Sequence, residues 1–500
     1  MHRLIKAMGL GLVVLTAACG NGGSDGGSGP ISISPATATV PVGGSRDFTL
    51  STSTPTTWSV DPAIGTISQL GVYTAPFVLP GPSTVTGPGP RATVTVSSSE
   101  AATTATVDIM SRFIDDGPVT IGTCPSPPPN SPPSECINAL AAPDLNGDGL
   151  SDLVTADTAN GTFSVTLRAS ASGFLPSVPY DVGAPTASEP QALAIADLDG
   201  DSRLDVAVAD AGATSRAVRS RLGLGNGAFG VEEVSTSLTD ATSAPLSMAV
   251  GQFDAPPVDT VPELDVAVAR FGNDVAPSDL TILRGDGKGF FTPMQTITSG
   301  VSLPVSVISA DLNNDQLDDL AVANSGGPGI NDAANTVAVF FGVGNGTFGV
   351  AELYPVAGGP SAVVAVDLNG DQFLDLAVTA AVDNTLTFIL NKGTPTASGP
   401  HFQDPSQPYA TGAVPIALAA ADVNGDQLQD LVVVNQDADS VSVFLGHGVG
   451  TAVLSETYPV GDVPRAVAVG YFNNDSWPDL AVANLGDDTV TILRNRGPGQ

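Results

Sequence analysis

A nine-residue acidic phrase recurs seven times between residue 137 and the end of the chain, and this repeat constrains the fold more than any other feature. The complete copies begin at Asp144, Asp197, Asp311, Asp367 and Asp422, and two degenerate copies begin at Gln252 and Tyr471. The copies lie about 54 residues apart, and each ends in an apolar run such as LAVAN. A period of this length indicates one supersecondary unit per copy.

Each unit except the last contains four short β-rich runs divided by Gly, Pro and Asn, with no long segment of helical period. One four-stranded unit cannot bury both of its faces alone, and radial stacking solves this. Seven units therefore predict an all-β fold, a seven-bladed β-propeller over residues 101–500. We expect the small L-A-V-A runs on the innermost strands. The last unit ends after its third strand, so residues 101–122 are expected to supply the missing one.

Residues 31–98 form a separate block of Thr/Val/Ile-rich strands between Gly and Pro turns, which predicts a small β-sandwich. The phrases ISISPATATVPVGG and TWSVDPAIGTIS resemble the bacterial immunoglobulin-like (Ig-like) group 2 domain. The resemblance implies a spacer.

Residues 1–19 read as an N-terminal signal: Arg3 and Lys6 precede an uncharged stretch too short to span a bilayer. The small residues before Cys19 resemble a bacterial lipoprotein signal peptide, which implies lipidation of Cys19; an ordinary secretory peptide is the alternative. Residues 20–30 are a Gly/Ser tether. Gly20 resembles the outer-membrane sorting pattern, so we expect a cell-envelope protein whose lipid anchor is its contact with the membrane.

Two further cysteines, Cys124 and Cys136, flank a Pro-rich segment. In an oxidising compartment a pair that closes such a short loop predicts a disulfide.

The repeated phrase D-x-[DN]-x-D-x-x-x-D places side-chain oxygens at positions one, three, five and nine, with the backbone carbonyl of position seven free to turn inward. Such hard oxygen donors suit Ca²⁺ better than Zn²⁺ or Mg²⁺. The alternative is that these residues only make tight turns. The predicted ligands, with the carbonyl donor fourth in each set, are Asp144, Asn146, Asp148, Leu150 and Asp152; Asp197, Asp199, Asp201, Arg203 and Asp205; Asp311, Asn313, Asp315, Leu317 and Asp319; Asp367, Asn369, Asp371, Phe373 and Asp375; and Asp422, Asn424, Asp426, Leu428 and Asp430. We expect about five structural calcium ions, with the third loop weak and the seventh empty.

The loops lack the bidentate glutamate of an EF-hand. Together with the phrases LGLGNGAFG from Leu222 and FFGVGNGTFG from Phe340, they resemble the FG-GAP or VCBS-type repeats, integrin α-subunit heads among them. The resemblance implies a propeller with calcium in the loops.

Composition limits the function. A net charge of −34 excludes an electrostatic footprint for nucleic acid. His401 and His447 lie in turn-like segments and are interpreted as surface residues, and no nucleophile motif is present. No catalytic residue is assigned, and an enzyme is the less favoured interpretation. We expect a module that binds a protein or a glycan, in an adhesion or interaction role. The alternatives are a polysaccharide lyase or hydrolase and an envelope-assembly scaffold. The enzyme would need a base with a neighbouring Arg, Lys or Tyr near the axis, and Tyr180, Tyr354 and Tyr409 do not assemble into such a set with the few basic residues.

Overall fold

The computed structural model describes residues 112–121, 137–170, 173–183, 188–212, 216–233, 237–238, 243–254, 263–272, 278–326, 335–393 and 400–497, together with the strand backbone of segments between 17 and 110. In this part of the chain no helix has the length and apolar character needed to cross a membrane.

Seven four-stranded antiparallel sheets follow one another along the chain. The first three are β12 (Ile137–Ala141), β13 (Leu153–Asp157), β14 (Thr162–Thr166) and β17 (Val178–Asp181); β18 (Pro190–Ala196), β19 (Asp205–Asp210), β20 (Ala217–Gly223) and β21 (Phe229–Glu233); and β22 (Ala244–Gly251), β23 (Asp265–Phe271), β24 (Asp279–Gly285) and β25 (Phe291–Ile297). The next three are β26 (Pro304–Ala310), β27 (Asp319–Asn324), β28 (Thr336–Phe340) and β29 (Glu352–Pro355); β30 (Pro360–Val366), β31 (Asp375–Ala380), β32 (Thr385–Ile389) and β33 (Tyr409–Ala410); and β34 (Pro415–Ala421), β35 (Asp430–Asn435), β36 (Ser440–Gly446) and β37 (Ala452–Pro459).

The seventh sheet shows how the ring closes. Its strands β38 (Pro464–Gly470), β39 (Asp479–Asn484) and β40 (Thr489–Asn495) come from the end of the chain, and its outer strand is β11 (Phe113–Thr120). β11 pairs antiparallel with β40, from Phe113 opposite Asn495 to Thr120 opposite Thr489. The predicted closure between the two ends of the repeat region is therefore confirmed.

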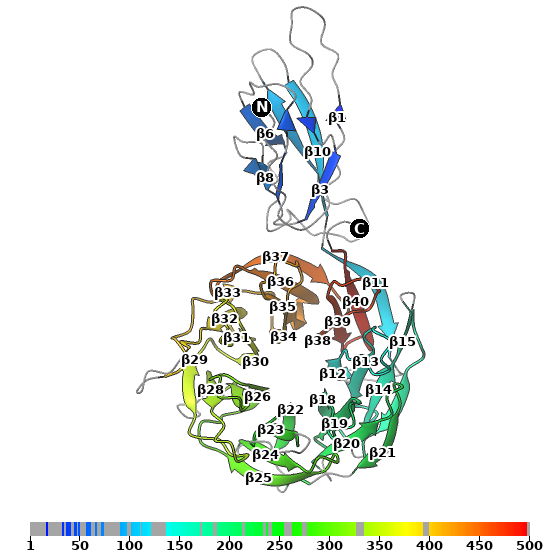
Figure 1. Cartoon of the computed structure of the whole chain (residues 1–500), viewed down its shortest axis with the longest axis vertical. Coiled ribbons are helices and arrows are strands. Elements are labelled where there is room, and N and C mark those ends of the chain that lie inside the picture. Colours follow the sequence, from blue (N-terminus) through cyan, green and yellow to red (C-terminus); the bar gives the residue numbers. More distant parts are fainter. Residues whose placement is uncertain are drawn as a thin grey trace, which may run out of the picture.

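The first strand of every sheet faces a common axis, as Figure 1 shows for β12, β18, β22, β26, β30, β34 and β38. Each of these strands contacts the next one, and β12 contacts β38. The seven-bladed β-propeller is thus confirmed. An additional hairpin, β15 (Arg168–Ser170) with β16 (Gly173–Phe174), lies within the first blade's connection to its fourth strand, and η1 (Gln436–Ala438) is a short 3-10 turn.

The L-A-V-A runs do not lie on the innermost strands as we expected. They form the second strand of each blade, for example β27 and β39, in which every residue is buried. The second strand is covered by neighbouring blades on both faces, which explains a continuous apolar run without alternation.

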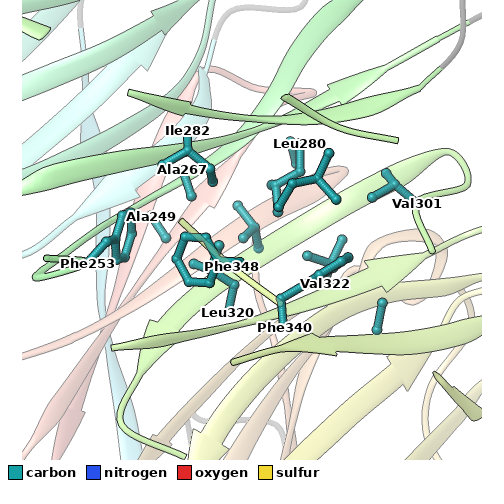
Figure 2. Packing of buried hydrophobic residues seen from close by; sticks show 14 residues of the cluster. Ala249, Phe253, Ala267, Leu280, Ile282, Val301, Leu320, Val322, Phe340 and Phe348 are labelled. Carbon is teal, nitrogen blue, oxygen red and sulfur yellow. The ribbon is translucent and has the colours of Figure 1, made fainter. Parts of the chain in front are cut away.

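Seven clusters of buried side chains lie in the described part of the chain, each between a different pair of neighbouring blades. Figure 2 shows the cluster between the third and fourth blades, where the Phe253 and Phe348 rings meet edge to face at 5.1 Å. Phe253 follows the first strand of the third blade. Phe348 lies in the phrase FFGVGNGTFG of the fourth blade, which begins at Phe340 and is called the FG phrase below. The two halves of each repeat signature thus pack across a blade interface.

Residues 17–110 contribute ten strands. They are β1 (Ala17–Ala18), β2 (Ile33–Ser34), β3 (Thr37–Pro41), β4 (Ser45–Asp47), β5 (Thr49–Leu50), β6 (Thr57–Asp61), β7 (Thr66–Ile67), β8 (Val72–Thr74), β9 (Arg91–Ser97) and β10 (Ala102–Met110). β10 pairs with β9 and β3, so the strands of segment 101–122 are divided between this block and the ring. The Ig-like sandwich stays a prediction. Cys19, the tether, Cys124 and Cys136 lie outside the described residues.

Candidate functional site

The five complete acidic loops join the first strand of a blade to its second strand, in blades one, two, four, five and six. Because every blade runs in the same order from the axis outward, these loops lie at one end of the ring. The hairpins between third and fourth strands lie at that same end, while the turns between second and third strands lie at the other. The predicted ligands of each loop are therefore gathered in one tight connection.

Hydrogen bonds within the first loop show how it curls. Asp144 Oδ2 accepts from the backbone N–H of Gly149 at 2.8 Å. Asn146 Oδ1 accepts from Asp148 N–H, and Asp148 Oδ1 accepts from Leu150 N–H, both at 2.9 Å. The other four complete loops repeat all three bonds. The acids and amides at positions one, three and five thus also act as turn residues.

The aspartate at position nine has a second role in the structure, as a buried bridge within the blade. Asp319, which is fully buried, accepts through one oxygen from Leu312 N–H at 3.0 Å and through the other from Gly342 N–H at 2.8 Å. Asp152, Asp205, Asp375, Asp430 and Asp479 make the same pair of bonds, and Asp265 makes the second one. All seven loops keep this acid, including the two that have lost position one. It therefore ties the loop to the end of the third strand.

We expect Asp479→Asn to destabilise the chain by about 1–3 kcal/mol whether or not calcium is present, because an amide nitrogen would then face a buried backbone N–H. Urea unfolding in calcium and in chelator measures this. Asp404→Asn, at an exposed position outside the loops, is the matched control. A cost for Asp479→Asn that vanishes in chelator would contradict the bridging role.

The carboxylates of the second loop lie close enough to share one cation. Oxygens of Asp197, Asp199 and Asp205 all lie within 4.8 Å of one another. The other complete loops have asparagine at position three, which offers a carbonyl oxygen in place of a carboxylate. Oxygen donors of this number and type, clustered in one loop, fit Ca²⁺.

Electrostatics in the loops also favour a cation. Burial raises the pKa of Asp319 to about 7; two backbone hydrogen bonds oppose the shift, and repulsion by Asp315 and Asp311 adds to it. Burial likewise raises the pKa of Asp152 and of Asp375 to about 6, again with repulsion from the acids of the same loop. A bound divalent ion would relieve this repulsion.

These raised pKa values predict that the stability of the chain depends on pH after calcium is removed. The folded-state pKa of these aspartates lies above the unfolded value, so their protonated form stabilises the fold. That contribution is complete below the unfolded pKa near 4 and is lost as the pH rises through about 6 to 7. We therefore expect the calcium-free chain to unfold at lower urea concentration at pH 7.5 than at pH 5. Equal urea midpoints at the two pH values would contradict the raised pKa values of these aspartates.

Position seven of each loop is predicted to donate a backbone carbonyl. Its side chain packs under the hairpin between the third and fourth strands of the same blade. A Cβ at Gly448 would lie 2.7 Å from Leu428, and one at Gly344 would lie 3.1 Å from Leu317. In the second loop the Arg203 guanidinium lies 3.1 Å from Asp201. The hairpin glycines of the FG phrase therefore make room for the acidic loop. The carbonyl ligands stay a prediction.

Four of the five complete loops, the first, fourth, fifth and sixth, are also held by the following blade. The N–H of Gly227 donates to the carbonyl of Leu145 at 3.2 Å, and Gly450 N–H donates to Leu368 at 2.9 Å. In the fifth and seventh blades an asparagine side chain makes the corresponding bond. Asn391 Nδ2 donates to the Leu312 carbonyl at 2.8 Å, and Asn495 Nδ2 donates to the Val423 carbonyl at 2.7 Å. The conformation of each of these loops is thus coupled to the packing between its blade and the next one.

The two degenerate loops have arginines beside their acids. In the third loop Arg284 lies 2.8 Å from Asp254 and 3.8 Å from Glu263. In the seventh loop, burial raises the pKa of Asp479 to about 6, and the positive charge of Arg494 opposes this rise. These guanidiniums supply positive charge where the ligand set is incomplete.

The tyrosines considered for catalysis hold the blades together instead. Tyr180 Oη accepts from Phe229 N–H at 3.3 Å in the next blade. The same bond joins Tyr354 to Phe402, Tyr409 to Ala452 and Tyr458 to Phe113. In the third blade Gln295 Oε1 takes this place and accepts from Phe348 N–H. Sequence reasoning missed this role, although Tyr354, Tyr409 and Tyr458 each lie six residues before the proline that opens the next unit.

His401 is also more constrained than its turn-like sequence indicates. Its Nδ1 lies 2.9 Å from Glu352 Oε1, its backbone N–H donates to Glu352 Oε2, and its ring centroid lies 4.0 Å from that of Phe341. His447 is exposed, as expected. Both oxygens of Glu352 are thus engaged by His401, and the pair joins two neighbouring blades.

Comparison with known families matches an FG-GAP-like repeat model to residues 144–208, 311–378, 367–433 and 422–482. The third loop falls outside these ranges, in line with its degenerate sequence. Comparison with curated protein sequences gave no match.

Solved structures resemble the ring at low sequence identity. BBS1N, in its complex with ARL6DN, is 14% identical with a TM-score of 0.50, over 77% of this chain and 97% of that chain. An Agrocybe aegerita lectin that recognises non-reducing terminal N-acetylglucosamine is 15% identical with a TM-score of 0.43, over 73% and 86%. A periplasmic gluconolactonase of Pseudomonas aeruginosa is 13% identical with a TM-score of 0.43, over 72% and 97%. At such identity the likeness concerns the fold alone. The repeat match and the observed ring agree: this chain carries FG-GAP-like repeats on a seven-bladed β-propeller.

Proposed function

We propose that this chain is a lipid-anchored module of a bacterial cell envelope, whose propeller is stabilised by calcium and binds a protein or a glycan. Cys19 would carry the lipid, the Ig-like block would act as a spacer, and the anchor places the protein at the outer membrane. Calcium, when bound, would neutralise the acidic loops and fix their shape.

The aspartate at position one carries the metal part of the proposal. The seventh loop has Tyr471 there, yet it keeps the turn bonds of Asn473 and Asp475 and the bridge of Asp479. Turn formation therefore does not require an acid at position one. Five loops nevertheless keep it, and a cation explains this retention better than turn chemistry does.

Exposed apolar side chains support a binding role for the loop-bearing end of the ring. Leu224, Val343 and Val449 are 52%, 61% and 68% exposed, and each lies in the hairpin between the third and fourth strands. With the neighbouring acids neutralised, these hairpins would offer an apolar surface to a partner. The engagement of Tyr180, Tyr354 and Tyr409 between blades favours binding over catalysis.

We expect a triple variant with serine at Leu224, Val343 and Val449 to bind partners at least ~10-fold more weakly, while melting like the wild type. Glycan arrays and pull-downs from envelope extracts identify the partner, and titration with it gives the dissociation constant. Val382→Ser is the matched control, because Val382 is 74% exposed but lies in a turn at the opposite end. Turnover of a polyanionic glycan, abolished by one Tyr or His substitution, would instead establish the enzyme alternative, and capture dominated by outer-membrane assembly proteins the scaffold.

A further inference from the structure

The sixth and seventh blades meet at a buried carboxylate of which only one oxygen is hydrogen-bonded. Glu456 lies on β37, the outer strand of the sixth blade, and is 5% exposed. Its Oε2 accepts from the backbone N–H of Arg112 at 3.0 Å. Its Oε1 is buried and has no hydrogen-bond partner among the described residues. Because an unsatisfied buried oxygen is costly, this carboxylate can gain stability from one further donor.

The fourth and fifth blades contain the same arrangement with both oxygens engaged. Glu352, like Glu456, lies two residues before the tyrosine that bonds to the next blade, and its Oε2 accepts from the backbone N–H of His401. Its Oε1 lies 2.9 Å from the side-chain Nδ1 of His401. His401 and Arg112 occupy equivalent positions, each directly before the phenylalanine whose N–H donates to that tyrosine. Only the side-chain contact is missing between the sixth and seventh blades.

The side chain of Arg112 lies at the sixth acidic loop instead. Its Nη1 donates to the carbonyl of Val423, at position two of that loop, over a long 3.4 Å, and its charge faces the acids at positions one, five and nine. Within the described part of the chain it belongs to none of the ion pairs. The guanidinium therefore lies near two sets of carboxylates, the sixth loop and Glu456, and forms a close pair with neither.

The ionisation of the two glutamates reflects this difference. Burial raises the pKa of Glu352, but the hydrogen bonds from Tyr354 and His401 oppose it and leave the pKa below its usual value. Burial raises the pKa of Glu456 to about 7, although the Arg112 N–H and the charges of Arg112 and Arg496 oppose the rise. A guanidinium at Oε1 would stabilise the ionised form of Glu456.

We propose that Arg112 has two positions, one at the sixth acidic loop and one at Glu456 Oε1, and that calcium in this loop drives it to the second; this rests on the proposed calcium role. A guanidinium beside the loop acids would be repelled by a divalent ion that they hold. Because the Arg112 N–H already contacts the Glu456 carboxylate, a change of side-chain rotamer is sufficient to bring the guanidinium there.

The position of Arg112 gives this movement a consequence. Arg112 directly precedes β11, the strand that closes the ring, and β10 of the N-terminal block ends at Met110. A pair between Arg112 and Glu456 would fasten the start of β11 to the outer strand of the sixth blade. Occupancy of the sixth loop would thus be coupled to the joint between the N-terminal block and the ring.

Carboxyl NMR of the full chain tests the movement, because the chain has eight glutamates and selective carbon-13 labelling gives few enough signals to follow separately. Glu456→Gln identifies the Glu456 signal. In chelator this carboxylate should titrate near pH 7, and in saturating calcium it should bind protons at least ~10-fold more weakly. The Glu352 signal is the internal control and should not respond to calcium, because both of its oxygens are already engaged.

Two variants separate the movement of Arg112 from other effects of calcium. Arg112→Gln keeps the backbone N–H but removes the guanidinium, so calcium should no longer change the Glu456 titration. The wild-type response in this variant would show that the ion acts on Glu456 directly, and would overturn the proposal. Asp426→Asn weakens the sixth loop and should abolish the response, whereas the matched Asp371→Asn in the fifth loop should preserve it. A full response in Asp426→Asn would also overturn the proposal.

Elemental analysis of the same samples distinguishes failure of this coupling from failure of the calcium sites. Bound calcium with an unchanged Glu456 titration would overturn the two positions of Arg112 and leave the calcium sites intact. Absence of bound calcium would reject the sites and the coupling together.

Discussion

We expect removal of calcium to lower the melting temperature of the chain and to reduce its free energy of unfolding by about 2 to 7 kcal/mol, because sites of extracellular affinity contribute about 0.4 to 1.4 kcal/mol each at millimolar calcium. Such a loss is comparable with the whole stability of an ordinary domain. Calorimetry of matched samples in calcium and in chelator measures the shift. Elemental analysis should find about five ions per chain.

Single variants locate the ions. Asp311→Ala removes a position-one donor from the fourth loop and should lower the calcium content by one ion, whereas Asp404→Ala, at an exposed position outside the loops, should not change it. The sixth loop should lose its ion first on dilution, because the charge of Arg112 faces Asp430, Asp426 and Asp422. An unchanged melting curve in chelator, with no calcium found in the protein, would reject the sites.

The fold was predictable because the repeat is strong and its internal order is the same in every copy. Periodicity, however, gives the order of strands along the chain and not their distance from the axis. The run DLAVAN at Asp319–Asn324 is continuous because both faces of β27 are buried, and a sequence alone does not say which strand of a blade is covered most completely.

The site was predictable in its outline only. A buried acceptor and a metal ligand use the same residue type, so the sequence does not separate the bridging role of Asp319 from its predicted role as a ligand. The tyrosine contacts were missed for a different reason. Phe113 precedes the first repeat and Tyr458 lies near the last one, so only the closure of the ring brings the Phe113 N–H to the Tyr458 hydroxyl.

Phe113→Ala should be among the most damaging substitutions in the chain, with a cost of about 3–5 kcal/mol. The side chain is fully buried between the sixth and seventh blades, and its ring meets Tyr458 edge to face at 5.4 Å. It occupies the position that Phe229 and Phe348 hold in other blades, but β11 brings it from the other end of the repeat region. The substitution therefore leaves a cavity at the one blade in which the chain closes on itself. Urea unfolding of the full chain measures the loss.

Phe290→Ala is the matched control, because the same atoms are removed from a side chain that is 40% exposed in the hairpin of the third blade. Its cost should stay near 0.5 kcal/mol. A cavity in the closing blade also exposes β40, whose outer edge β11 covers, so Phe113→Ala should increase self-association at high protein concentration while the control does not. Equal, small costs for the two variants would mean that the ring holds together without its closing strand.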